Sequence, residues 1–387
     1  MKKILFVTNK LTTGGMEIAL YETVKVLKQQ DFDITVATML SGGNLVESFK
    51  EICTVKDLSK DYNKAFITSK TVINNFKKVQ LISLIKNLFL LLKQRFASYY
   101  KFKELISKRM PRDDQHYDFA VAYATPYTSY VPYILNNITA DKKLGWVELD
   151  VSSYLKEVDV SGFEECYARL DNVICDSEHS RLSFITRHPS LSEKTLAVYN
   201  PIDTERIFNA SQENSDIIFE DETVLCTVGR LSYDKGFDIA VGAHKILKDK
   251  GYRFKWLVCG EGDYRSALEE NIKESGLEND FILLGNQKNP YKYINAADIY
   301  VQTSRTESYC LTLAEARVLK KPIVTTNIPT ATEHVTNGYN GYICDMNAES
   351  VANAIEQLIN SPELRQKFSE NTTPIDCDNS ALKKLFE

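Results

Sequence analysis

Short apolar runs, rich in β-branched residues and bounded by polar loops, recur along the whole chain. The runs expected to form buried strands lie at residues 3–8, 34–38, 118–123, 143–147, 172–177, 196–203, 221–228, 254–259, 281–287, 298–302 and 323–325. Several of these runs lead into segments with the helical spacing of apolar residues. A buried strand followed by a helix, repeated along a chain, indicates an α/β fold with parallel sheets.

The clearest unit of this kind spans residues 298–325. A buried strand leads into a short polar loop and then a helix, which Pro322 ends before a second strand begins. The loop and the helix N-terminus therefore open at the carboxyl edge of a parallel sheet, where open α/β sheets bind ligands. Glu307 lies in the loop, and Glu315 lies between one and two turns into the helix.

These two carboxylates have two interpretations. The free N–H groups of the first helical turn favour an anion such as a phosphate, and the helix dipole acts in the same direction. A carboxylate on each side of a bound diphosphate suits hydroxyl-rich groups at its two ends. In the alternative, Glu307 is a solvated loop residue and Glu315 an ordinary helix residue.

A second loop of interest follows the strand at 221–228. Arg230 and Lys235 flank this loop, and Gly229 and Gly236 free its backbone. Two fixed cations stabilise the negative charge that develops on a leaving nucleoside diphosphate. A solvated Arg and Lys on a turn is the alternative interpretation.

Glycine pairs follow two of the expected strands. Gly14 and Gly15 precede a helical pattern, an arrangement that lets the backbone approach a phosphate, although a simple turn explains it equally well. The glycines of 260–262 invite a dinucleotide-binding interpretation. Arg265 stands where that fingerprint requires Gly or Ala, so a tight turn between strand and helix is the better prediction.

The stretch from Glu307 to Glu315 resembles the E-x7-E signature of the retaining glycosyltransferases of family 4 (group 1), which include enzymes of capsule and exopolysaccharide synthesis. The resemblance is strongest over residues 223–345. It implies the GT-B fold, in which two Rossmann-like domains face each other across a cleft. Residues 1–200 would form the acceptor-side domain and 201–370 the nucleotide-sugar domain, while the tail at 371–387 would be able to cross back to the first domain.

The resemblance also assigns roles to individual residues. Glu307 would hold the hydroxyls of the donor sugar, Glu315 the ribose, and Arg230 with Lys235 the diphosphate. The full set of donor-binding residues that it implies is Gly14, Gly15, Arg230, Lys235, Gly285, Asn286, Glu307, Ser308, Tyr309, Cys310, Leu311 and Glu315. After the first Glu the family commonly has Gly-Phe-Gly/Pro-Leu, so Ser308-Tyr309-Cys310-Leu311 departs from it and bears on which sugar fits.

Glu148 is a further candidate for the catalytic set. Similar capsule-type enzymes often carry Trp-Ile/Val-His at this place, with the His near the reacting sugar carbon, whereas this chain has Trp146-Val147-Glu148. Either Glu148 holds a donor or acceptor hydroxyl, or the alignment with that motif is shifted, or Glu148 is a surface loop residue.

Composition narrows the class of protein. A net charge of −5 over 387 residues argues against general nucleic-acid binding. Eight cysteines without a C-x-x-C pair suggest neither a zinc site nor a disulfide framework, and the N-terminus has no signal-peptide core, so we expect a cytoplasmic protein. The D-x-D sequences at 31–33 and 376–378 are interpreted as turns, and neither a metal nor a cofactor is expected.

Residues 69–110 stand apart in composition. They carry ten Lys or Arg and a single acidic residue, Glu104, around an apolar stretch at 81–92 that is too short to span a bilayer. A basic amphipathic helix of this kind can lie on an anionic membrane surface. The alternative is a helix that packs on the N-terminal domain with a solvated basic face.

Taken with the resemblance, these patterns predict a retaining, metal-independent hexosyltransferase. It would move a sugar from a nucleoside diphosphate sugar, with a UDP-sugar as the expected donor, to a hydroxyl of a glycan or lipid-linked acceptor in bacterial surface polysaccharide synthesis. A peripheral position on the inner face of the plasma membrane would suit such an acceptor. Two alternatives remain: a sugar-nucleotide epimerase of the same fold, and a non-catalytic partner subunit of a transferase.

Overall fold

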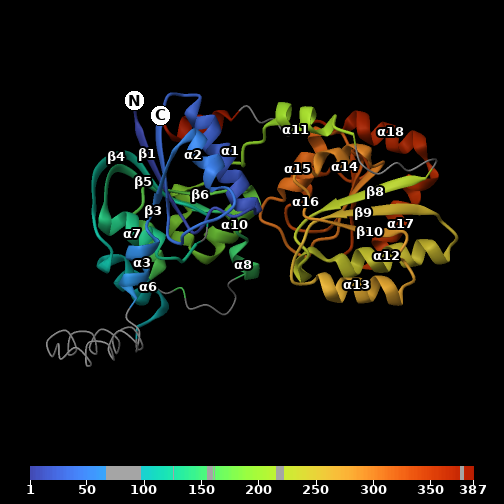
Figure 1. The fold of residues 1–387 in the computed structure, drawn as a ribbon, viewed down its shortest axis with the longest axis horizontal. Coiled ribbons are helices and arrows are strands. Elements are labelled where there is room, and N and C mark those ends of the chain that lie inside the picture. Colours follow the sequence, from blue (N-terminus) through green and yellow to red (C-terminus); the bar gives the residue numbers. More distant parts are fainter. Residues whose placement is uncertain (67–96, 125, 155–159, 161, 215–221, 375–378) are drawn as a thin grey trace. The chain divides into compact units, whose positions relative to one another are not determined.

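The chain folds into two compact units (Figure 1). In the computed structural model, the first unit comprises Met1–Pro201 together with Asn379–Glu387, and the second comprises Ile202–Asp378. The structure describes residues 1–66, 97–124, 126–154, 160, 162–214, 222–374 and 379–387. Each unit contains one parallel β-sheet, as predicted for a Rossmann-like domain.

The first unit is built on a seven-stranded sheet with the order β3-β2-β1-β4-β5-β6-β7. Its strands are β1 (Lys3–Thr8), β2 (Asp33–Thr38), β3 (Thr54–Asp57), β4 (Asp113–Ala122), β5 (Ile138–Val147), β6 (Asn172–Cys175) and β7 (Thr195–Ala197). Its helices are α1 (Gly15–Lys28), α2 (Val46–Ile52), α3 (Ser59–Ala65), α6 (Tyr99–Arg109), α7 (Tyr130–Asn137), α8 (Val151–Tyr154), α9 (Phe163–Ala168), α10 (Glu178–Arg187), the 3-10 helix η1 (Pro189–Lys194) and α19 (Ser380–Leu385). The order reverses at β1, so the strands on either side wind in opposite directions.

The second unit is built on a six-stranded sheet with the order β10-β9-β8-β11-β12-β13. Its strands are β8 (Thr223–Val228), β9 (Phe254–Cys259), β10 (Phe281–Gly285), β11 (Ile299–Gln302), β12 (Ile323–Thr326) and β13 (Gly341–Cys344). Its helices are α11 (Thr204–Ser211), the 3-10 helix η2 (Tyr233–Lys235), α12 (Phe237–Asp249), α13 (Arg265–Glu274), α14 (Tyr291–Ala296), α15 (Leu311–Val318), α16 (Ala331–His334), α17 (Ala348–Asn360) and α18 (Pro362–Asn371).

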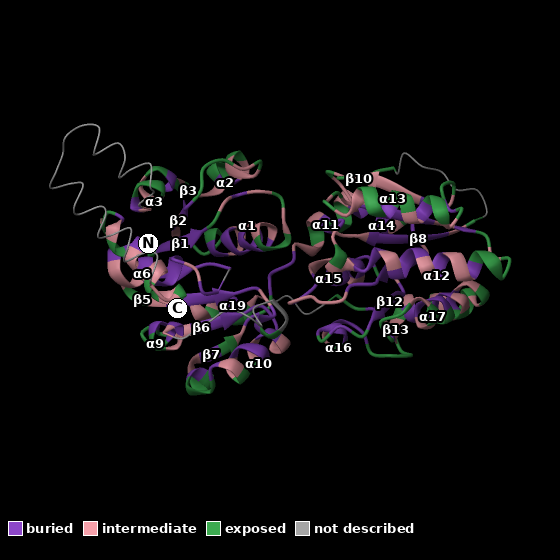
Figure 2. Ribbon diagram, turned by 90° about the horizontal axis from the view of Figure 1, so that it is seen from below, coloured by how far each residue is buried: buried purple, intermediate pink, exposed green. Residues whose placement is uncertain are grey.

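The central strands of each sheet are buried on both faces (Figure 2), whereas the edge strands β3 and β10 are partly exposed. Side chains alternate between the two faces along a strand, so in β8 Leu225 packs into one core cluster and Cys226 into the other. This burial explains why the strands read as nearly continuous apolar runs rather than alternating ones. The buried strands therefore fix the positions of the polar residues at their ends.

The last helix of the chain belongs to the first unit. Phe386, at the end of α19, is fully buried and its ring contacts those of Phe6, Phe32 and Phe119. Burial of one such aromatic side chain stabilises a fold by roughly 1.5–3 kcal/mol. The C-terminal residues thereby become part of the core around β1.

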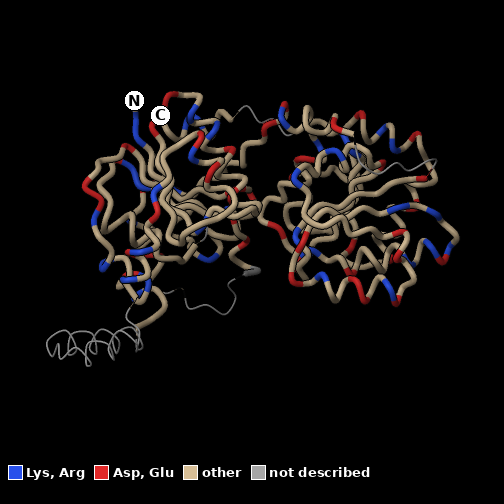
Figure 3. The backbone as a smooth tube through the Cα atoms, in the orientation of Figure 1, with Lys and Arg blue, Asp and Glu red and all other residues tan. Residues whose placement is uncertain are grey.

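Charged residues of both signs are interspersed over both units (Figure 3). Within the described residues, no helix has the length and apolar character needed to cross a membrane. Of the basic segment singled out at 69–110, residues 69–96 lie outside the described part of the chain, and the remainder contains α6. Of the two D-x-D sequences, 376–378 likewise lies outside it, and the other leads into β2 at Asp33.

Candidate functional site

Lys235 and Glu307 form an ion pair at the carboxyl edge of the second sheet. Lys235 Nζ lies 2.7 Å from Oε1 and 2.7 Å from Oε2 of Glu307, so the contact is bidentate. Burial by itself lowers the pKa of Lys235, but the Glu307 charge raises it above its ordinary value, and the lysine stays charged. The two side chains are only 19% and 12% exposed, and this shielding strengthens their attraction.

A buried polar network holds Glu307 in place. Ser304 Oγ donates to Glu307 Oε1 at 2.7 Å, and Gln302 Nε2 donates to Ser304 Oγ at 2.8 Å. Tyr300 OH donates in turn to Gln302 Oε1 at 2.9 Å. Gln302 and Ser304 are fully buried, and such satisfied networks fix side-chain geometry.

The two loops singled out in the sequence are joined by Arg305. Its guanidinium makes a bidentate contact with Asp238, at 2.8 and 2.7 Å, and donates to Tyr233 O at 2.8 Å. It also lies 4.0 Å from the centroid of the Tyr233 ring. The backbone N–H of Arg305 donates to the carbonyl of Asp234 at 2.7 Å, so the loop after β8 and the loop after β11 are joined by both backbone and side-chain contacts.

Gly236 is required where these loops meet. Its φ is +63°, and a Cβ there would lie 2.0 Å from the carbonyl oxygen of Thr303. Both the left-handed backbone and the close approach favour glycine. The approach brings Lys235 within reach of the strand end that carries Glu307.

Arg230 lies at the same edge but is exposed. Among the described residues its guanidinium has no hydrogen-bonding or ionic partner. Its loop is supported by the turn after β9, where a Cβ on Gly260 would lie 1.8 Å from Gly229 O and one on Gly262 would lie 2.2 Å from Leu231 O. The glycines of 260–262 thus serve close loop packing, in agreement with the tight-turn interpretation.

Glu315 lies in the second turn of α15, which begins at Leu311. Tyr291 OH donates to Glu315 Oε1 at 3.1 Å, and Arg206 NH2 donates to Tyr291 OH at 3.4 Å. Glu315 is therefore held from α14 and α11, on a different set of supports from Glu307.

The residues between the two glutamates are mostly turned into the protein. Tyr309 and Cys310 are buried, at 1% and 6% exposed, and belong to a core cluster. Cys310 has φ +68°, a left-handed conformation that starts α15. His334 Nε2 contacts the carbonyl of Tyr309, and burial lowers the pKa of His334 to about 4. His334 is thus a neutral structural residue, and the buried side chains of Tyr309 and Cys310 leave their backbone as the part that can meet a ligand.

Gly285 and Asn286 lie at the end of β10, at the same carboxyl edge. Gly285 has φ +72°, its carbonyl accepts from Gly260 N at 2.8 Å, and Asn286 is exposed. The second sheet therefore brings the loops after β8, β9, β10 and β11 to one edge, as the strand order requires.

In the first unit, Gly14 and Gly15 start α1. Gly14 is the N-cap in extended backbone, and a Cβ there would lie 2.6 Å from Glu17 Oε2. Gly15 is exposed. Burial raises the pKa of Glu17 above its ordinary value.

Glu148 is buried at the end of β5, so the interpretation as a surface loop residue is wrong. The hydroxyl of Tyr123 donates to its carboxyl group, and the Asn200 side chain also hydrogen-bonds to it. Burial and the nearby negative charge of Asp176 raise the pKa of Glu148 well above its ordinary value, which favours the protonated form of its carboxyl group. Asp150, also buried, accepts hydrogen bonds from the hydroxyls of nearby serines.

Several residues of these edges were not singled out from the sequence. In the first unit they are Tyr123, Asp176 and Asn200, and in the second Arg206, Asp238, Tyr291, Gln302 and Arg305. The available signal was position: Tyr123, Asp176 and Asn200 each follow the end of a strand. In the described part of the chain, no group of three or more His, Cys, Asp or Glu is arranged to hold a metal ion.

Comparison with known proteins supports a family for part of the chain. Residues 209–374 match the family model of glycosyl transferases group 1. Capsular polysaccharide biosynthesis glycosyltransferase CapM of Staphylococcus aureus is 29% identical over 165 residues, which are 42% of this chain and 43% of that protein. Amylovoran biosynthesis glycosyltransferase AmsD of Erwinia amylovora is 26% identical over 206 residues, 53% and 57% of the two chains. The chain spans about half the length of the curated relatives it matches.

Solved structures match over nearly the whole chain. A glycosyltransferase from Rickettsia africae superposes with a TM-score of 0.70 at 18% identity, covering 99% of this chain and 97% of that one. Alr3699/HepE from Anabaena, in complex with UDP and glucose, superposes with a TM-score of 0.70 at 17% identity, covering 100% and 99%. At such identities the likeness shows the fold, and it confirms the predicted GT-B architecture of two Rossmann-like domains.

Proposed function

We propose that the whole chain is a group 1 glycosyltransferase, a retaining and metal-independent hexosyltransferase that uses a nucleoside diphosphate sugar. The observation that carries this proposal is the Lys235–Glu307 pair beside the exposed Arg230 at the carboxyl edge of the second sheet. The family match over 209–374 includes all three residues. The UDP complex of a protein with the same fold favours UDP as the nucleotide.

The donor would bind on the second unit through groups of opposite charge. Arg230 and Lys235 would hold the diphosphate, with backbone N–H groups from Ser308 to Leu311 at the start of α15 adding donors. Lys235 would then contact the diphosphate in place of Glu307, and the Glu307 carboxylate would accept hydrogen bonds from the hydroxyls of the sugar. Glu315, which Tyr291 already orients, would accept the ribose hydroxyls, and the backbone of Gly285 and Asn286 would contact the base.

In the reaction, the bond between the anomeric carbon and the diphosphate oxygen would break while the acceptor oxygen approaches from the same face. The leaving phosphate oxygen would take the acceptor proton, so that no enzyme nucleophile is needed and the configuration is retained. Charge accumulates on the diphosphate in the transition state, and Arg230 and Lys235 would stabilise it there more than in the ground state.

The first unit would bind the acceptor. Gly14 and Gly15 would let a ligand approach the backbone at the N-terminus of α1, and Glu148, whose raised pKa favours a protonated carboxyl group, would donate a hydrogen bond to an acceptor hydroxyl. The names of CapM and AmsD favour a glycan or lipid-linked acceptor in bacterial surface polysaccharide synthesis. Residues 69–110 would then contact the inner face of the plasma membrane, where such an acceptor lies, while the enzyme itself is cytoplasmic.

A thermal-shift panel of UDP, GDP and ADP and their sugar derivatives, in EDTA, tests this proposal. We expect UDP and one UDP-sugar to raise the melting temperature, because a ligand that binds only the native state stabilises it by mass action. The best derivative is then tested for transfer to an acceptor. No shift with any nucleotide would favour a non-catalytic partner subunit, and conversion of the sugar nucleotide without an acceptor would favour an epimerase.

A further inference from the structure

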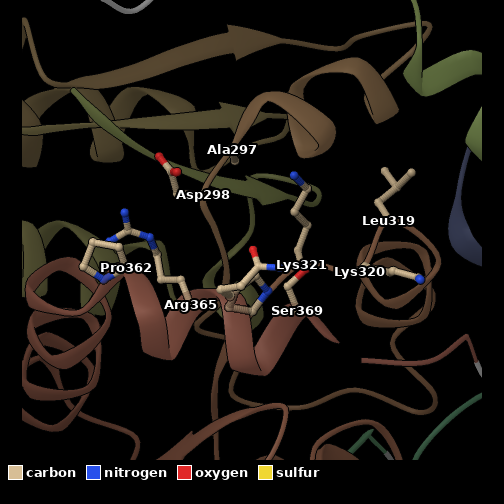
Figure 4. A pocket seen from close by; sticks show the side chains of 10 residues that line it. Ala297, Asp298, Leu319, Lys320, Lys321, Pro362, Arg365 and Ser369 are labelled. Carbon is tan, nitrogen blue, oxygen red and sulfur yellow. The ribbon is translucent and has the colours of Figure 1, made fainter. Parts of the chain in front are cut away.

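A pocket opens at the amino edge of the second sheet, away from the carboxyl edge that carries Lys235 and Glu307. It has a volume of about 320 Å³ and lies between the starts of β11 and β12 and the helix α18 (Figure 4). Lys321, Arg365 and Asp298 line it. The family motifs do not reach this place, and the donor roles proposed above do not involve it.

Lys321 brings a fixed positive charge to the pocket. Its Nζ donates to the carbonyl of Asn295 at 2.6 Å, and no other hydrogen bond to Nζ occurs within the described ranges. An ammonium group has three donors, so two remain for a ligand. The anchoring to Asn295 orients the charge before any ligand arrives.

Arg365 is anchored in the same manner on the other side. Its NH1 donates to the carbonyls of Leu358 and Ile359, at 2.7 and 3.2 Å, at the end of α17. Nε and NH2 make no hydrogen bond with any residue that the structure describes, which leaves the outer part of the guanidinium for an anion. Figure 4 shows Arg365 and Lys321 extending toward the side of the pocket where Asp298 lies, whereas Lys320 extends away from them.

Asp298 adds an acceptor to the two cations. Its Oδ2 accepts from Val224 N at 2.8 Å, which fixes the carboxylate at the start of β8. Burial lowers the pKa of Lys321 and the charge of Asp298 opposes this shift, and no ion pair within 4.0 Å joins Asp298 to Lys321 or Arg365 among the described residues. The two cations and the carboxylate thus line one pocket without pairing, because each is hydrogen-bonded to a different part of the backbone.

We propose that this pocket binds a small phosphate monoester that also carries hydroxyl groups, of which a sugar phosphate is the simplest kind. Arg365 and Lys321 hold the phosphate, because a guanidinium and an ammonium together match its charge and its several acceptor oxygens. Asp298 accepts a hydroxyl of the same molecule. The volume suits a ligand of this size, at the small end of ligand pockets.

The test is a calorimetric titration of the full chain with glucose 6-phosphate, with glucose as the uncharged probe. All variants carry Lys235→Ala, so that binding at the carboxyl edge is suppressed and a failure of the proposed transferase function does not affect the result. We expect glucose 6-phosphate to bind this parent with a millimolar or lower Kd and glucose not to bind. Arg365→Gln is expected to weaken binding at least tenfold.

Two further variants guard against a folding artefact. Gln366→Glu adds a negative charge at an exposed position in the pocket lining, leaves both anchored cations in place and is also expected to weaken binding tenfold. Lys367→Gln removes a charge from an exposed position of α18 that does not line the pocket, and binding is expected to be unchanged. Absence of binding to the parent, equal binding of glucose, or equal losses in Lys367→Gln and Arg365→Gln would each overturn the proposal.

Discussion

The carboxyl edges of the two sheets accommodate carboxyl groups of low exposure in different ways. In the second unit, partly buried charges occur in pairs: Lys235 with Glu307, and Arg305 with Asp238. In the first unit, the buried carboxyl group of Glu148 faces the hydroxyl of Tyr123 and the amide of Asn200, and burial together with the charge of Asp176 raises its pKa. The second edge pairs its carboxylates with cations, whereas the first favours a protonated carboxyl group at Glu148.

The difference bears on what each edge can bind. A paired cation can exchange its carboxylate for a phosphate, so the second edge suits an ionic ligand. A neutral carboxylic acid among hydroxyl and amide groups can donate and accept hydrogen bonds without charge, and that edge suits a polyol. This difference motivates the proposed placement of the charged donor on the second unit and of the acceptor hydroxyl on the first.

The strongest test of the comparison is Lys235→Ala. We expect transfer to fall roughly 1,000-fold and the UDP-dependent thermal shift to be lost, because the substitution removes a cation aimed at the developing charge. Lys245→Ala, in an exposed pair with Asp249 on α12, is the matched control and should retain activity. Full transfer rates in a folded Lys235→Ala protein would contradict the role of the charge pair.

Gly236→Ala tests whether the paired edge depends on the contact between its two loops. The left-handed φ and the collision with Thr303 O predict a loss of about 3 kcal/mol in the free energy of unfolding. Gly251→Ala is the control, because Gly251 also has a positive φ, +93°, but has no atom within 4 Å of the added Cβ. Urea denaturation of both variants measures the difference, and equal losses would mean that the loop contact contributes little.

Arg305→Met tests the second charge pair. Removal of the guanidinium leaves Asp238 without its bidentate partner and frees Tyr233, and we expect the free energy of unfolding to fall by about 2 kcal/mol. A double-mutant cycle with Asp238→Asn isolates the pair from the rest of the contacts. Additive effects in that cycle would show that the two loops are joined by other contacts.

Glu148→Gln tests the neutral edge through its pH dependence. The folded-state pKa of Glu148 lies well above the unfolded value near 4.5, so the native protein holds a proton that the unfolded chain releases. The stability from this group is fully present below the unfolded pKa and is lost as pH rises toward the folded one. A glutamine side chain has no such proton to lose, so the Glu148→Gln variant does not share this pH-dependent loss. Between pH 5 and pH 8, its free energy of unfolding minus that of wild type should therefore increase, by at most about 1.4 kcal/mol per pH unit. Parallel curves in urea denaturation would show that Glu148 is ionised.

The sequence was most informative where the site is local. Arg230 and Lys235 share one loop, and Glu307 and Glu315 share one strand-loop-helix unit, so their order along the chain already places them at one sheet edge. The strand pattern gave the parallel sheets for the same reason. The edge strands β3 and β13 went unrecognised, because an edge strand buries fewer of its side chains than the equally short central strands β11 and β12 and so carries a weaker apolar signal.

Features that depend on distant contacts could not be predicted. The clamp of Arg305 on Asp238 joins residues 67 positions apart, and nothing in either loop indicates it. The raised pKa of Glu148 depends on its burial and on Asp176, while Tyr123 and Asn200 hydrogen-bond to its carboxyl group, and the fold brings these residues together from different strand ends. Tyr309 stands within the motif yet is a core residue, because the left-handed Cys310 that follows begins the helix.

The bidentate contact between Lys235 and Glu307 gives each charge a partner that an incoming ligand can replace. If Lys235 takes the diphosphate as proposed, Glu307 is released at the same moment to receive sugar hydroxyls, and neither charge is left bare. After transfer, the sugar would have left, and the same carboxylate would compete with the nucleotide product for the lysine. The affinity for the nucleotide product would therefore be limited by an intramolecular competitor, and the contact that prepares the site for substrate would also help to release the product.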